Sequence, residues 1–64
     1  MTTYLILHAS KDKPLEILDD FKFEKDMILF IPTKGKVKVI EVIYFVAPQG
    51  AVASLSCNVY YQLI

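Results

Sequence analysis

The chain has 64 residues and a mass of 7.3 kDa, which is enough for a single small domain over residues 1–64 and leaves no room for a second core. Its hydrophobic content of 55% excludes intrinsic disorder, and no apolar run approaches the roughly 18 residues that a membrane-spanning helix requires. Seven lysines balance seven acidic residues, and this zero net charge argues against nucleic acid as a partner. From the charge and the short apolar runs together, we expect neither nucleic acid nor a membrane as a partner.

The single cysteine, Cys57, excludes an internal disulfide and a zinc site built from cysteines. An unpaired cysteine fits a reducing compartment better than a secreted protein. The N-terminus also lacks the basic segment and apolar segment of a signal peptide. The sequence therefore predicts a cytoplasmic protein.

The first predicted element is a strand over Thr2–Ala9, a short run rich in β-branched and aromatic residues. Apolar side chains occupy both of its faces, which is typical of a central strand or of a strand covered on both sides. Residues 10–14 end it, because Pro14 biases Lys13 toward an extended conformation outside a regular element.

Residues 15–26 have two interpretations. The extended one is favoured, because apolar and charged residues alternate on both sides of an Asp19–Asp20 turn, as in a hairpin. The alternative is one short helix at 14–22, in which Pro14 would occupy the first turn and Leu15, Leu18 and Phe21 would share a face. This helix would change the fold class from all-β to α+β.

Met27–Ile31 is an uninterrupted apolar run, so we expect a strand that is buried on both faces or forms part of an interface. A tight turn at Pro32–Gly35 leads into a long strand over Lys36–Val46. The alternation of apolar and polar residues changes phase at Ile40. Such a change inside a strand predicts a β-bulge or a sharp bend, which lets one strand serve two parts of a small barrel.

The clearest pattern is a hairpin over Lys36–Ile64, joined by a connector at residues 47–50. Pro48 suits the second position of a type I turn, and Gly50 can adopt the left-handed conformation that follows it. The last strand alternates with period two, which is the pattern of a half-buried strand. The residues that we expect to point inward from the two strands are Val37, Val39, Ile40, Val42, Tyr44, Ala53, Leu55, Cys57, Val59, Tyr61 and Leu63.

These inward residues nearly fill the core of so small a barrel, and large apolar side chains are left over. Scattered surface hydrophobes are normal, but on neighbouring strands these side chains would form one contiguous patch. We expect a second copy or another protein to cover the patch. The interface residues that the sequence predicts are Phe30, Ile43, Phe45 and Tyr60.

The sequence offers no catalytic residues, no metal ligands and no cofactor motif. His8 is the only histidine, and Cys57 falls on the apolar side of its strand, so a Cys57–His8 nucleophilic pair is disfavoured. The acidic residues lie in loops, where carboxylates usually form solvated turns. Neither glycine belongs to a phosphate-binding loop. We therefore expect a protein that is not an enzyme.

A second candidate site is a basic ridge of Lys34, Lys36 and Lys38, which alternate along the predicted strand. Such a ridge could bind a small anionic ligand or nucleotide. The competing interpretation is a solvated face on which lysines protect a strand edge from aggregation.

Together the elements predict an all-β fold, a small five-stranded antiparallel barrel with a topology like that of SH3 domains, in which residues 10–26 form the first long loop. The function expected for it is non-enzymatic protein binding, by a homo-oligomer that uses its apolar strand surface to bind itself and another protein. A lone chain of this size suits a small accessory or inhibitor protein, such as those of phages or mobile elements. The alternatives are an oligomeric binder of an anionic ligand and a weak nucleic-acid-binding barrel.

Overall fold

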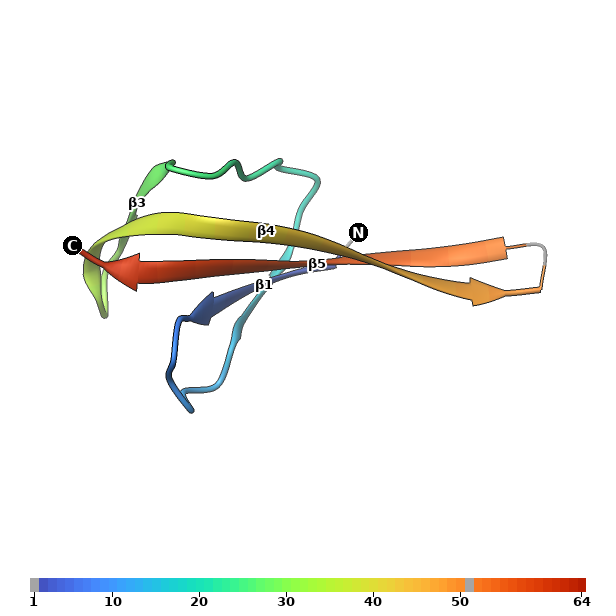
Figure 1. Ribbon diagram of the computed structural model, residues 1–64, viewed down its shortest axis with the longest axis horizontal. Helices are drawn as coiled ribbons and strands as arrows, with labels where there is room; N and C mark the ends of the chain where they lie inside the picture. The colour runs from blue at the N-terminus through green and yellow to red at the C-terminus, as the bar shows by residue number, and fades with distance from the viewer. Residues whose placement is uncertain (1, 51) are drawn as a thin grey trace.

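The computed structural model describes residues 2–50 and 52–64, and the regular structure within these ranges consists of β-strands alone (Figure 1). The all-β prediction is therefore confirmed. The strands are β1 (Thr2–Leu7), β2 (Leu15–Leu18), β3 (Ile28–Ile31), β4 (Gly35–Gln49) and β5 (Val52–Leu63).

The five strands form one sheet in the order β2-β1-β5-β4-β3. The sheet curls through 230° into a half-barrel, which remains open between its edge strands β2 and β3. The predicted run of three antiparallel strands at the C-terminal end is confirmed as β3-β4-β5. One pair differs from the expected antiparallel arrangement, because β1 runs parallel to β5.

β1 is an interior strand of the sheet, with β2 on one side and β5 on the other, as its two apolar faces indicated. Thr3 and Leu5 point into the curl of the sheet and are buried. The strand ends at Leu7 rather than Ala9, because residues 8–9 form a turn in which Ala9 has a φ of 57°.

The segment after β1 is extended, and the short-helix alternative is wrong. Leu15–Leu18 pairs antiparallel with β1. Residues 19–27 then cross to the far edge of the sheet, and within them the predicted second arm of a hairpin at Phe21–Glu24 does not form. A connection that must reach β3 cannot fold back on β2. Its Phe23 and Met27 instead pack against the core.

β3 is an edge strand, and its burial alternates along the chain. Leu29 and Ile31 pack against the core, whereas Ile28 and Phe30 are exposed. The expectation of burial on both faces is therefore wrong for β3, because the sheet has a single core-facing side at this edge.

The predicted bulge is confirmed. The register of β4 with β5 shifts between Val39 and Glu41, so Ile40 is the extra residue. Ile40 lines a hollow on the outer face of the sheet, together with Glu41 and Tyr60. The expectation that Ile40 points into the core is therefore wrong.

The hairpin of β4 and β5 is longer than the sequence predicted. The strands remain paired through Pro48 with Ala53 and Gln49 with Val52, so Pro48 belongs to β4 and not to the turn. Proline is tolerated on a strand where its missing N–H faces away from the partner strand. Gly50 has a φ of 67°, as predicted for the position that requires a left-handed conformation.

The core occupies only the base of this hairpin. Its buried residues come from β1, β4 and β5, and the fully enclosed side chains Val37, Val39 and Val59 lie at its centre. Tyr44, Leu55 and Leu63, which we expected to point into the core, are each about half exposed, at 50%, 53% and 53%. The core ends there because the strands that flank β4 and β5 are much shorter than the hairpin.

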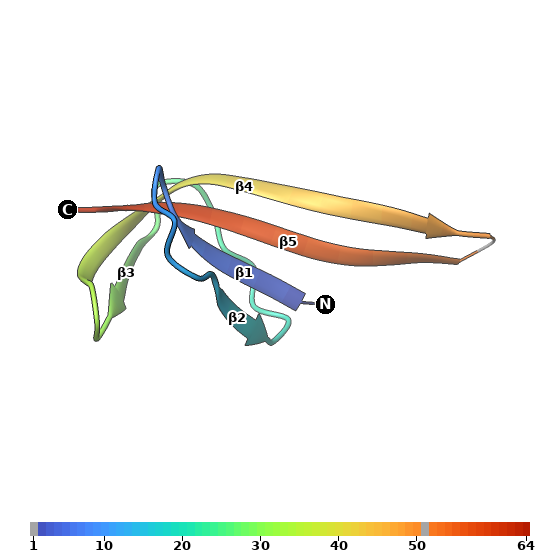
Figure 2. The ribbon, with the colours of Figure 1, turned by 90° about the horizontal axis from the view of Figure 1, so that it is seen from below.

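The molecule is elongated as a result. It measures 42 × 22 × 18 Å, and its radius of gyration is 12.6 Å, against about 10.7 Å for a compact domain of this length. Figures 1 and 2 show the cause from two directions, since the far end of the β4–β5 hairpin projects well beyond the other strands.

Candidate functional site

The most distinctive surface is the projecting end of the hairpin, residues 44–49 and 52–56, which we call the arm. β1 meets β5 only from Ser56 onward, and β3 pairs with β4 only as far as Lys38. Apart from the pair of Thr2 with Ser56 at its base, no other strand in the described part of the chain flanks the arm. It is therefore a two-stranded ribbon with both faces and both edges in solvent (Figure 2).

The arm is apolar despite this exposure. Its large hydrophobic side chains are exposed by 48% to 71%, and they are Tyr44, Phe45, Val46, Val52 and Leu55. An isolated two-stranded ribbon is at best marginally stable in water. Large exposed apolar patches on small proteins mark interaction sites.

The register of the hairpin divides these side chains between two faces. Residues directly opposite each other on antiparallel strands share a face. Val46 and Leu55 are opposite each other and continue the line of the core face, and Tyr44 joins them opposite buried Cys57. Phe45 is opposite Ser56 on the outer face of the sheet.

The structure brings three of the four predicted interface residues together. Ile43, Phe45 and Tyr60 lie on the outer face of the β4–β5 hairpin, where Ile43 and Tyr60 line the same hollow. Phe30 is on the edge strand β3 opposite Lys36, at the other side of the sheet, and is exposed by 69%.

Sequence reasoning missed the core-face half of the arm, because the period-two pattern assigned Tyr44 and Leu55 to the core. A signal for their exposure was available in the lengths of the elements. The predicted hairpin is several residues longer on each strand than any strand that could cover it. Side chains at its far end therefore had no predicted neighbour, whatever their periodicity.

The arm itself carries no charged side chain. All seven lysines, all seven acidic residues and the histidine lie within residues 1–41, and residues 42–64 contain no ionisable side chain except those of cysteine and tyrosine. Native edge strands usually carry charges that discourage pairing with other chains. The arm lacks this protection.

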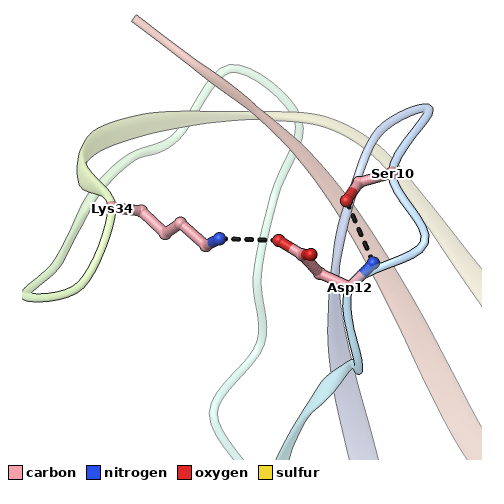
Figure 3. Close-up of polar contacts among 3 residues, drawn as sticks. All are labelled: Ser10, Asp12 and Lys34. Carbon is pink, nitrogen blue, oxygen red and sulfur yellow. Dashed lines mark hydrogen bonds and ion pairs between the residues drawn. The ribbon is translucent and has the colours of Figure 1, made fainter.

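The three lysines of the predicted ridge do not lie in one row. Lys34 is in the turn before β4, and its Nζ donates a hydrogen bond to Asp12 Oδ2 at 2.7 Å (Figure 3). Lys38 forms an ion pair with Asp26 at 3.4 Å. Lys36 is exposed on β4, and it shares a face with Lys38 two residues away.

The Asp12–Lys34 pair links the loop after β1 to the turn before β4. The hydrogen bond and the charge of Lys34 lower the pKa of the Asp12 carboxyl, and Asp12 in turn raises the pKa of Lys34. Ser10 Oγ accepts a hydrogen bond from the Asp12 amide at 3.0 Å, which orders the same loop (Figure 3). The ammonium group of Lys34 is thus already bonded to the carboxylate of Asp12.

Asp12 and Lys34 line a cleft of about 850 Å³ on the open side of the half-barrel. The cleft is wide enough for a ligand, but its lining mixes lysines with carboxylates and apolar side chains. Its residues are Tyr4, Leu7, Asp12, Lys13, Pro14, Leu15, Glu16, Ile31, Thr33, Lys34 and Tyr61.

The Cys57–His8 pair that the sequence disfavoured does not assemble. Cys57 is buried beside Thr3 on the core face, whereas His8 is exposed in the turn after β1 and lines the outer hollow. Burial raises the pKa of the Cys57 thiol, which suppresses the reactive thiolate. Among the described residues, no cluster of His, Cys, Asp or Glu could hold a metal ion.

Comparison with known proteins gives no relative, since no family model, curated protein or solved structure matches the chain. Within residues 2–50 and 52–64, no helix is long and apolar enough to cross a membrane.

Proposed function

We propose that this chain is a non-enzymatic protein-binding module, an accessory or inhibitor protein, that associates through its arm. The observation that carries the proposal is the exposure of Tyr44, Phe45, Val46, Val52 and Leu55 on a ribbon without flanking strands. A protein surface that covers the ribbon would remove this apolar area from water.

The energies of burial favour a partner that contacts apolar side chains on both faces of the arm and also pairs with its backbone. Complete burial of a large apolar side chain contributes about 1.5–3 kcal/mol, and these side chains are already about half buried, so each would add roughly 1 kcal/mol. Association costs an estimated 4–15 kcal/mol in lost freedom. Covering one face would fall short, and covering both would approach balance before any backbone pairing is counted.

The observed contacts do not favour an anionic ligand. Lys34 and Lys38 are paired with Asp12 and Asp26, so an anion at the predicted ridge would compete with carboxylates that are already in place. We therefore do not extend the proposal to a small anion or to nucleic acid.

Light scattering on a sizing column, from dilute to concentrated solution, tests the proposal with two phenylalanine variants. Phe45→Glu places a charge on the arm, and Phe30→Glu places the same charge on the outer face of β3. Both side chains are exposed, at 48% and 69%, so neither change should disturb the core.

We expect the native chain and the Phe30→Glu variant to self-associate. We expect Phe45→Glu to weaken association at least about tenfold, which corresponds to ~1.4 kcal/mol. Circular dichroism of each variant checks that the fold is retained. A native chain that remains monomeric at every concentration would overturn self-association through the arm.

A further inference from the structure

We propose that the occupant of the arm is a second copy of this chain, which pairs antiparallel along the outer edge of β4 about a two-fold axis at Tyr44. This inference rests on the proposed function and specifies its geometry. The two half-barrels would thereby share one continuous sheet of ten strands, since each contributes the five strands of its own sheet.

The outer edge of β4 is free from the bulge to the tip. Next to β3, the Val39 amide donates to the Met27 carbonyl at 2.9 Å, and the Val39 carbonyl accepts from the Asp26 amide at 2.8 Å. Beyond Val39, no strand in the described ranges lies on this side of β4. Within the described ranges, no strand therefore pairs with the backbone groups there.

The position of Pro48 shows which residues direct their backbone N–H and C=O groups to this free edge. Successive residues of a strand direct their N–H and C=O groups alternately to the two sides. Pro48 has no amide hydrogen, so it occupies a position that faces away from β5. Counting back by two residues places the backbone groups of Val46, Tyr44 and Val42 on the same outer edge.

The other end of the strand supports this assignment independently. Val39 faces the outer side through its bonds to the segment before β3. An odd spacing separates Val39 from Val42, and the one-residue bulge at Ile40 accounts for it. The assignments from Pro48 and from Val39 therefore give the same free amides, those of Val42, Tyr44 and Val46.

The free edge is self-complementary. With Tyr44 opposite Tyr44 of the other copy, Val42 lies opposite Val46, and each of the three residues can exchange two hydrogen bonds with its counterpart. Phe45 then lies opposite Ile43 on the outer face. The pairing thus brings apolar side chains together on both faces.

Neighbouring registers are less favourable. A shift in one direction places Phe45 opposite charged Glu41. A shift in the other direction places Val42 opposite Pro48, whose missing amide leaves a carbonyl without a donor. The register centred on Tyr44 avoids both penalties, and its pairing is confined to Val42–Val46, because the outer backbone groups of Val39 are already bonded to Asp26 and Met27.

Charge and area favour a second copy as the occupant. The arm carries no charge, so two copies meet without like-charge repulsion and no oppositely charged partner is specified. The accessible surface is 4787 Å², about 600 Å² more than the ~4,200 Å² of a compact protein of this mass. This excess is close to the ~800 Å² that each partner buries in a standard interface.

Disulfide trapping tests the register with single-cysteine variants made in a Cys57→Ala background, because Cys57 lies directly opposite Tyr44 and would otherwise bond to a new cysteine there within one chain. In the proposed dimer, the two copies of Tyr44→Cys are about 5.5 Å apart between Cα atoms, within the range of a disulfide. Two copies of Val46→Cys, on the same face of the arm, are about 14 Å apart and cannot be bridged. The Cys57→Ala chain without a new cysteine is the control, and its solution mass checks that this background retains the association of the native chain.

We expect Tyr44→Cys to cross-link under mild oxidation about ten times faster than Val46→Cys, because only the first pair lies within disulfide distance. A mixture of Val42→Cys and Val46→Cys, which keeps Tyr44, should cross-link where neither variant does alone. Equal rates at positions 44 and 46, or a mixture that stays uncross-linked, would overturn the register. If light scattering still shows a dimer, the proposed function survives this result, whereas a monomeric native chain overturns both.

Discussion

Thr3 is a polar residue that is buried in an otherwise apolar core. It is 1% exposed on the core face of β1, between Ile17 of β2 and Cys57 of β5. Its Oγ1 has no hydrogen-bond partner among the described residues. A buried hydroxyl without a partner costs free energy, since it has given up its bonds to water.

Replacing Thr3 with valine should therefore stabilise the domain. Valine has the same branched shape and removes only the hydroxyl, so we expect the free energy of unfolding in urea to rise by about 1 kcal/mol. Thr2→Val, at a half-buried neighbour on the opposite face, is the control and should change stability by less than about 0.5 kcal/mol. A loss of stability in Thr3→Val would show that the hydroxyl is bonded in solution.

The lysines illustrate how far single residues could be predicted. Alternation along a strand correctly groups Lys36 with Lys38, but Lys34 precedes the strand and bonds to Asp12, a residue far away in sequence. Such a pairing depends on how the loop after β1 meets the turn before β4. The local sequence cannot predict the contact between these two segments, because it depends on the arrangement of the whole sheet.

At the scale of elements, the β4–β5 hairpin has two parts with different roles. Its base is covered by the curl of the sheet and supplies Val37, Val39 and Val59 to the core. Its arm extends past every flanking strand in the described chain. The same period-two pattern runs through both parts, so periodicity alone could not separate them.

Two truncations on one face of β5 test this division. Val59→Ala, in the base, should lower the free energy of unfolding by about 2 kcal/mol, because it leaves a cavity in a closely packed core. Leu55→Ala, in the arm, should cost less than about 0.5 kcal/mol in solutions dilute enough to dissociate the proposed dimer. Equal losses from the two variants would mean that the core extends along the arm.

The elements themselves were largely predictable from local chemistry. The phase change at Ile40 identified the bulge, and the need for a left-handed residue identified Gly50. The turn was misplaced because Pro48 suits a turn and an edge strand equally well. Which of these applies depends on whether another strand lies beside it.

At the scale of the whole molecule, the sequence predicted the class and the strand number, and it missed the direction of β1 and the open side. The direction of β1 relative to β5 is set by the crossover at residues 19–27, which carries the chain from β2 to the opposite edge. Strand composition is similar for either direction. The open side likewise depends on how far the sheet curls, which is a property of all five strands together.

The elongated shape follows from the same long-range causes. A domain this small buries only about 60% of the surface that its unfolded chain exposes, so its stability margin is thin. Extending an apolar arm into water adds to that difficulty for a monomer. The proposed pairing with a second copy would remove part of this apolar surface from water and make folding stability depend on concentration.

Amide hydrogen exchange of β4, followed residue by residue in the native chain and in Phe45→Glu, tests this claim most directly. We predict slow exchange at Val42, Tyr44 and Val46 in the concentrated native chain, and fast exchange at the same amides on dilution or in the variant. Ile43 and Phe45, whose amides face β5, should stay protected in the folded variant and provide the internal reference. Fast exchange at Val42, Tyr44 and Val46 at every concentration of the native chain would contradict the pairing of two copies along β4.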